Sequence, residues 1–205
     1  MAFRIMSAIA ACLFAAAVQA ADIASPGVLV KTASQDVIAL LKKTHGGAHQ
    51  PRAAILEKIA PDFDFTHMTR LAVGQYWRQA TPQQQAALTR QFRDLLVNTY
   101  ANAMSHYRNQ TVQYEPLALS PNASYATVQM IFVERGGQRV PINYYMQKMV
   151  DGWKVYDVGV DGVSLVINYR NSFADEIQRS GINGLISVLA RKNASLSGDR
   201  HSGGA

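Results

Sequence analysis

The stretch 153–173 constrains the fold more than any other part of the chain, because its two halves need partners on two different layers. Its first six residues alternate between two faces, as a half-buried strand does, with Trp153, Val155 and Asp157 on one face. Gly159 and Gly162 interrupt this pattern. The apolar residues then recur every four positions, as on one face of a helix: Leu165, Tyr169, Phe173 and Ile177. We interpret this strand, turn and helix as the unit that closes an apolar cavity.

Residues 1–20 have the features of a signal peptide. Arg4 precedes an apolar run, which ends in the small-residue cleavage site Val18-Gln19-Ala20 and is too short to span a bilayer. The single cysteine, Cys12, follows a lipobox-like sequence, but the apolar run continues past it, which favours cleavage after Ala20. The mature chain is therefore expected to be exported and to contain no cysteine, which excludes thiol catalysis, disulfides and Cys-ligated metals.

The composition of the mature chain indicates one globular domain. About 185 residues can bury a sizeable core, and without disulfides the fold must depend on that core. The formal net charge of the whole chain is +6, or about +5 without Arg4, but the basic residues are spread singly. This pattern does not match a nucleic-acid-binding surface.

Helices are predicted first, over about 28–109. Short helices are expected at 34–43, from Pro51, and from 63–65 with Asp64 as the N-cap. A long helix to about Tyr107 begins at a capping box formed by Thr81 and Gln84. After the long helix, the sequence predicts a sheet over about 111–160, closing helices over about 163–193, and a disordered tail over 194–205.

The sheet is predicted to have four strands and to be at least partly antiparallel. Turn signals at Gly136-Gly137 and Asp151-Gly152 are short enough for hairpins. This order of helices, then strands, then helices indicates an α+β fold for the single domain 21–193. The expected strands are 111–116, 124–134, 139–150 and 152–158.

The sequence contains few candidates for catalytic, nucleotide-binding or metal-binding residues. It contains no P-loop, dinucleotide fingerprint or G-x-S-x-G motif, and its histidines have no metal-ligand spacing apart from the loop pair His45 and His49. We therefore predict no catalytic residue and no metal site. Asp157 and Asp161 bracket the turn after the last strand, where one could act as a general base or both could serve as cap and turn residues. We favour the second interpretation.

Several blocks of the sequence resemble the MlaC family of periplasmic phospholipid carriers, also called the toluene-tolerance auxiliary family. Together they span about 25–193 in family order. The blocks are 71–77 (LAVGQYW), 80–84 (ATPQQ), 92–96 with Thr99 and Tyr100, 156–158 with 161–165 (DGVSL), 168–170 (NYR) with Phe173, and 181–185 (GINGL).

The resemblance implies a twisted sheet of the nuclear-transport-factor-2-like (NTF2-like) kind, with a flanking helical subdomain that encloses an apolar lipid pocket. It implies no cofactor other than the lipid cargo. Family members ferry phospholipid through the periplasm between an outer-membrane lipoprotein complex and an inner-membrane ABC transporter with an MCE-domain subunit, which maintains outer-membrane lipid asymmetry. Some relatives are encoded with hopanoid-biosynthesis enzymes, so the cargo could instead be a hopanoid.

On this reading, apolar side chains from the long helix, the sheet and the closing unit are expected to contact the lipid. Methionines and aromatic residues at such spacing usually form an ordinary core, and periodicity alone does not separate the two. Arg70 and Arg170 are expected near the pocket mouth, although either could equally be a surface ion-pair partner. The predicted lipid contacts are Phe92, Leu96, Tyr100, Val128, Met130, Phe132, Tyr144, Met146, Val163, Val166 and Tyr169.

Two other functions remain open from the residues. One is an isomerase or hydratase on the same fold, acting on a sterol-like or hopanoid-type substrate with Asp157 or Asp161 as base. The other is an adaptor that docks membrane complexes without carrying lipid. An adaptor would have a filled core, whereas a carrier must keep a cavity.

Overall fold

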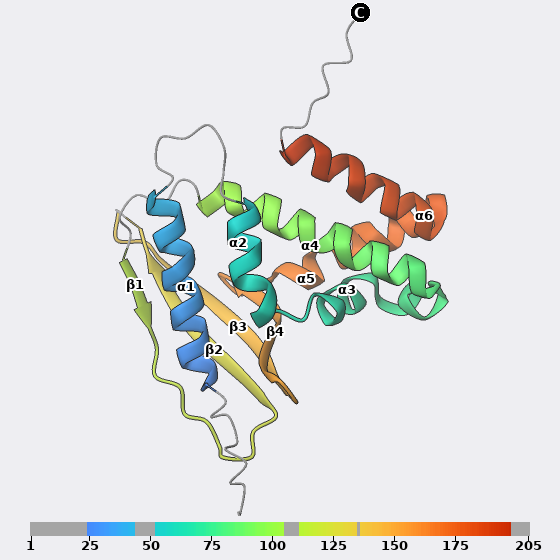
Figure 1. Cartoon of the computed structure of the whole chain (residues 1–205). Coiled ribbons are helices and arrows are strands. Elements are labelled where there is room, and N and C mark those ends of the chain that lie inside the picture. Colours follow the sequence, from blue (N-terminus) through green and yellow to red (C-terminus); the bar gives the residue numbers. More distant parts are fainter. Residues whose placement is uncertain (1–23, 44–51, 105–110, 135, 198–205) are drawn as a thin grey trace, which may run out of the picture.

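A computed structural model describes residues 24–43, 52–104, 111–134 and 136–197. The expected signal peptide, the His45/His49 loop and Tyr107 lie outside these residues. The described chain is α+β, as the sequence predicts. Two helices cover one face of a sheet, and a bundle of helices extends from one side of it (Figure 1).

The sheet is a meander in which every strand pairs antiparallel with the next one along the chain. The prediction of four strands was incomplete, because a fifth strand of two residues follows a two-residue turn at Asp161 and Gly162. Both turn residues have positive φ, 49° and 80°, which suits a tight hairpin. The strands are β1 (Thr111–Tyr114), β2 (Tyr125–Val133), β3 (Arg139–Met149), β4 (Gly152–Val160) and β5 (Val163–Ser164).

A β-bulge interrupts β4, so the strict alternation predicted for that strand was wrong. The pairing of β3 with β4 shifts between Tyr145 and Met146, so that these residues pair with Asp157 and Val155. Val155, Val158 and the following Val160 consequently face the same side of the sheet, which strict alternation does not allow.

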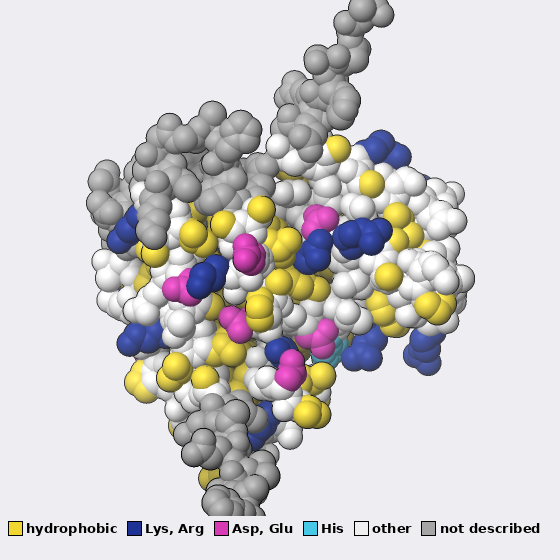
Figure 2. All heavy atoms as spheres, viewed as in Figure 1, with side chains coloured by type: hydrophobic (Ala, Val, Ile, Leu, Met, Phe, Trp, Pro, Cys, Tyr) yellow, Lys and Arg dark blue, Asp and Glu magenta, His cyan; other side chains and the backbone are white. Residues whose placement is uncertain are grey.

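The first two helices lie across this side of the sheet (Figure 1). Helix α1 (Pro26–Lys43) starts eight residues before the predicted 34–43, and α2 (Arg52–Ile59) starts one residue after Pro51. An ion pair of 3.0 Å between Lys58 Nζ and Asp36 Oδ2 joins the two helices at their surface. Viewed from this side, acidic and basic side chains are interspersed with apolar ones (Figure 2).

Local capping signals position the middle helices as predicted. After the short 3-10 helix η1 (Ala60–Asp62), Asp64 Oδ1 accepts the N–H of His67 at 2.8 Å and starts α3 (Phe65–Val73). A second 3-10 helix, η2 (Gly74–Gln79), leads to α4 (Pro82–Met104). There Gln84 N donates to Thr81 Oγ1 at 3.2 Å, and Thr81 N donates to Gln84 Oε1 at 2.9 Å, which completes the capping box.

The chain closes with α5 (Leu165–Asn168) and α6 (Arg170–Ser197), and α6 packs beside α4 (Figure 1). Gly181 has φ 71° and ψ 178°, so α6 consists of two helical segments, as expected from the sequence. The tail predicted to be disordered from residue 194 is helical through Ser197.

Three separate apolar clusters hold these layers together. The largest joins α3 to α6 around Leu88 and Phe92, and the second joins α1 to the sheet around Val128 and Met146. The third is a small contact of α1 with α2, at Val37, Leu41 and Ile55. These clusters do not merge into a single core, and a cavity lies between them.

Candidate functional site

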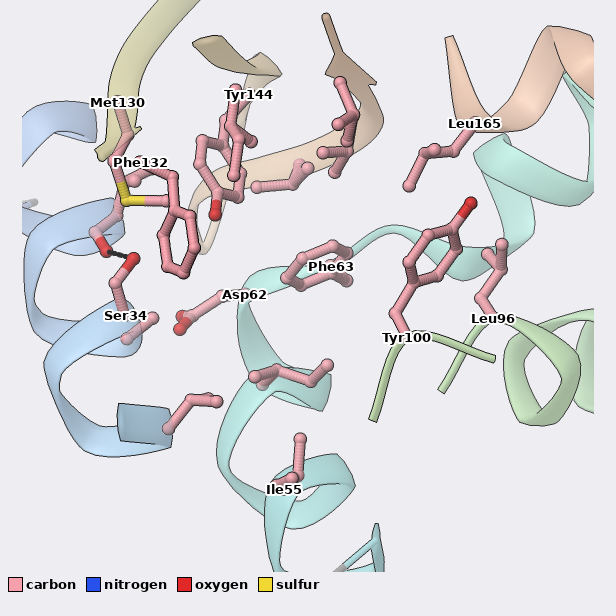
Figure 3. Close-up of a pocket in the computed structure, with 18 of the residues that line it drawn as sticks. Ser34, Ile55, Asp62, Phe63, Leu96, Tyr100, Met130, Phe132, Tyr144 and Leu165 are labelled. Atoms are coloured by element: carbon pink, nitrogen blue, oxygen red, sulfur yellow. Dashed lines mark hydrogen bonds between the residues drawn. The ribbon is translucent and has the colours of Figure 1, made fainter. Parts of the chain in front are cut away.

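The cavity has a volume of about 520 Å³ and lies between α1, α2, α4 and the sheet (Figure 3). This volume is within the range of pockets that bind small molecules. Members of all three apolar clusters reach its wall, for example Met68, Val155 and Ile55. The space is therefore bounded by packed elements on several sides.

Helices and their connecting loop form one part of the wall, and their contribution is almost entirely aliphatic or aromatic. Helix α1 contributes one residue per turn or more, because its apolar stripe faces the sheet. The helical wall comprises Leu29, Val30, Ala33, Ser34, Val37, Ile38 and Leu41 of α1, Ile55 and Ile59 of α2, Asp62, Phe63, Phe65, Met68, Leu96, Val97, Tyr100 and Leu165.

The sheet forms the opposite wall through side chains that alternate along each strand. In β2 and β3 the cavity-facing residues are paired across the sheet, as Met130 is with Ile142 and Phe132 with Val140. The sheet wall comprises Val112, Met130, Phe132, Glu134, Val140, Ile142, Tyr144, Val155, Val158 and Val160.

Few polar groups interrupt these walls. Ser34 Oγ donates to the backbone oxygen of Val30 at 2.6 Å, which satisfies the hydroxyl within its own helix. Burial raises the pKa of Tyr144 to about 12, against the opposing effect of a hydrogen bond with Ser34. Burial, with a smaller effect of Tyr169, also raises the pKa of Tyr100 to about 12. Both phenols are therefore neutral at physiological pH, and the wall suits an apolar ligand.

A comparison with known protein families identifies the chain. The family model described as MlaC protein matches residues 31–191, which include every residue that lines the cavity except Leu29 and Val30. The chain belongs to the MlaC family. The family expected from the sequence blocks is thereby confirmed.

Individual relatives agree with this assignment. The toluene tolerance protein ttg2D of Pseudomonas putida is 33% identical over 106 residues, which are 52% of this chain and only 49% of that protein. The intermembrane phospholipid transport system binding protein MlaC of Haemophilus influenzae is 22% identical over 172 residues, 80% of each chain. A phospholipid-binding protein from Ralstonia solanacearum, solved in complex with a phospholipid, is 37% identical with a TM-score of 0.77, covering 85% of this chain and 99% of that one.

Within this MlaC-family fold, five of the eleven predicted lipid contacts lie in the cavity wall. They come from two elements that the sequence predicts well, the long helix and the alternating strands. These five are Leu96, Tyr100, Met130, Phe132 and Tyr144.

The structure places the other six predicted contacts outside the cavity wall, for two physical reasons. Val128 and Met146, which are 2% and 0% exposed, fill the core between the sheet and α1, while Phe92, Val166 and Tyr169 belong to the helical cluster. Val163 is instead 56% exposed, because β5 lies at the sheet edge.

Neither arginine predicted at the mouth lines the cavity. Arg70 is exposed on α3, and Arg170 is exposed at the start of α6. The guanidinium of Arg170 packs instead against Gly74, 3.4 Å from the position that a Cβ would occupy. Gly74 has φ 63°, so this contact forms where the chain turns from α3 into η2.

The two carboxylates considered as catalytic bases occupy positions typical of cap and turn residues. Asp157 Oδ1 accepts the N–H groups of Val158 and Val166 at 2.8 and 3.2 Å, and Oδ2 accepts the hydroxyl of Ser164 at 2.5 Å. Asp161 is exposed in the β4–β5 turn. Neither carboxylate lines the cavity, so the cap and turn interpretation fits both.

The prediction missed the contributions of α1, α2 and the loop at Phe63. The apolar stripe of α1 was visible in the sequence, but an amphipathic stripe predicts burial without distinguishing a core from a cavity wall. Among the described residues there is no group of three His, Asp or Glu side chains that could hold a metal ion. No helix in the same part of the chain is long and apolar enough to span a membrane.

Proposed function

We propose that this chain is a periplasmic lipid carrier, which holds a phospholipid by its acyl chains and shuttles it between membrane complexes. The observation that carries the proposal is the open apolar cavity between three clusters that together could have formed one filled core. The phospholipid bound by the Ralstonia relative, and the transport system named for the Haemophilus relative, support the same function.

The energetics of acyl chains explain why a carrier needs such a cavity. Each buried methylene contributes about 0.8 kcal/mol, so two chains of about sixteen carbons would cost about 25 kcal/mol to expose to water. A diffusing protein must hide most of that surface. Since non-covalent affinity saturates near about 18–21 kcal/mol, release is easier if the headgroup remains largely in solvent.

The proposed lipid contacts are the cavity-lining residues, including Leu96, Tyr100, Met130, Phe132 and Tyr144. The proposed partners are an outer-membrane lipoprotein complex and the MCE-domain subunit of an inner-membrane ABC transporter, as in other MlaC-family systems. Exchange with these partners in the periplasm would support outer-membrane lipid asymmetry. A non-enzymatic role agrees with the positions of Asp157 and Asp161 away from the cavity wall.

Native mass spectrometry of protein purified without detergent tests the proposal. We expect a mass excess of one glycerophospholipid per chain, and lipid extraction would separate this result from a bound hopanoid. An empty protein that takes up no labelled lipid from vesicles would contradict the carrier function and favour an adaptor.

A matched pair of tryptophan variants tests the position of the lipid. Ile142 faces the cavity, so Ile142→Trp is expected to fill it and reduce lipid occupancy. Gln129 is exposed on the opposite face of the neighbouring strand β2, so Gln129→Trp is expected to leave occupancy unchanged. Equal occupancy in two folded variants would argue against this cavity as the binding site.

A further inference from the structure

Asp62 is the one described carboxylate that extends into the cavity from its helical wall. It ends η1, between the α2 segment and Phe63, and its side chain points toward Ser34 of α1 (Figure 3). The residue is half-buried. The other acidic lining residue, Glu134, is exposed directly after β2.

The Asp62 carboxylate has no hydrogen-bond or ion-pair partner within the described part of the chain. Burial raises its pKa, and the positive charge of Lys154 opposes that rise only in part. Lys154 is itself engaged elsewhere, since its Nζ donates to the Pro61 backbone oxygen at 2.8 Å and pairs with Asp151 at 2.9 Å. An unpaired carboxylate at an apolar wall costs stability, and a ligand that brings a donor would remove this cost.

The charged side chains of the described cavity lining are all acidic. The lining contains the carboxylates of Asp62 and Glu134, and none of its residues is Lys, Arg or His. This is unexpected in a chain of net charge +6. An anionic group at this wall finds no cationic partner there, whereas an ammonium group finds a carboxylate without a competing ion pair.

We propose that Asp62 determines lipid specificity by binding the ammonium group of an amine-bearing headgroup. The inference rests on the proposed carrier function and adds a preference among its ligands. A lipid with an ammonium beyond its phosphate can donate to Asp62 while the phosphate remains in solvent. An anionic lipid without an amine offers no such donor and brings its negative charge toward Asp62.

The test is a competition between two lipids with identical acyl chains. Delipidated protein is incubated with vesicles containing equal amounts of phosphatidylethanolamine and phosphatidylglycerol, and the bound lipids are counted by native mass spectrometry. We expect the wild-type protein to prefer phosphatidylethanolamine by about five- to tenfold, the usual effect of a partly exposed charge-assisted hydrogen bond.

Asp62→Asn should bring this preference to within about twofold of unity, measured as the ratio of the two bound lipids in each sample. Asp175→Asn is the matched control, because Asp175 is exposed on α6 and does not line the cavity. It removes the same charge and should keep the wild-type preference. Circular dichroism of both variants confirms that each is folded.

The remaining outcomes overturn the inference in distinguishable ways. If wild-type protein binds both lipids equally, or Asp62→Asn keeps the preference, Asp62 does not determine specificity and the carrier function is unaffected. If the control loses the preference too, long-range charge rather than Asp62 is responsible. If neither lipid binds to wild-type protein, both the carrier function and this specificity are wrong.

Discussion

The Asp157 carboxylate accepts the backbone N–H of Val166 at 3.2 Å and thereby ties the end of β4 to the first turn of α5. Ser164, the N-cap of α5, accepts the N–H of Ile167 at 3.0 Å and donates its hydroxyl to the same carboxylate. Asp157 is only 8% exposed, so these bonds are largely shielded from water. The Asp157 side chain thus links the sheet to the start of the closing helices.

We expect Asp157→Ala to destabilise the protein by about 2–3 kcal/mol, because two N–H groups and one hydroxyl lose a charged acceptor. Urea unfolding measures this change. Asp161→Asn serves as the control and should be nearly neutral, since asparagine adopts the positive φ of this turn readily. Unchanged stability of Asp157→Ala would contradict the capping role.

Asp62→Asn should stabilise the protein at neutral pH, in contrast to the effect at Asp157. Burial raises the pKa of Asp62, so the charged form is less favourable in the folded protein than in the unfolded chain. The stabilising effect of the neutral form is present below the ordinary pKa of 3.8 and is lost as pH rises through the folded pKa. Thermal unfolding of both proteins should therefore differ at pH 7 and converge toward pH 3. A lower unfolding temperature for the variant at pH 7 would contradict this prediction.

Tyr100 and Tyr144 should be among the last of the nine tyrosines to ionise in an absorbance titration. Because burial raises both pKa values to about 12, their contribution to stability is intact below pH 10 and is lost between pH 10 and about 12. Tyr144→Phe should lose less stability than the wild type over this interval. The prediction fails if both proteins lose stability equally.

Gly74→Ala is expected to cost about 2 kcal/mol, because φ 63° with ψ −132° is a conformation that residues with a Cβ rarely adopt. Its new Cβ would lie 3.4 Å from Arg170 Nε, an ordinary contact, so backbone strain is the cause. Gly27→Ala is the control, since Gly27 lies in α1 with no atom within 4 Å of an added Cβ. That change should stabilise the protein by up to about 1 kcal/mol, as measured by urea unfolding.

Features fixed by neighbouring residues were predictable from the sequence. The cap at Asp64 and the box at Thr81 and Gln84 depend on residues within one helical turn, so the sequence contains the whole interaction. The start of α1 was also readable, because Ser25 and Pro26 form a helix-start signal, and Val28 N donates to Ser25 Oγ at 3.4 Å. That signal was overlooked.

The cavity could be predicted only in part, because its wall depends on tertiary register. The bulge beside Asp157 turns Val158 and Val160 toward the same space as Val155, and it exists only when β3 is paired with β4. The sequence likewise marks Met130 and Met146 as equally apolar. Whether each faces the cavity or the core depends on what α1 covers, which no local pattern encodes.

The three apolar clusters surround a space instead of filling it, so the interior of the protein is fully packed only when a ligand occupies the cavity. A ligand that binds only the folded form stabilises it by mass action, so heat and proteases unfold or cleave the ligand-free protein most readily. The ligand-free protein is then also the least stable form. A cell would retain the occupied molecules longest, and the turnover rate of the protein would itself record how well it is supplied with cargo.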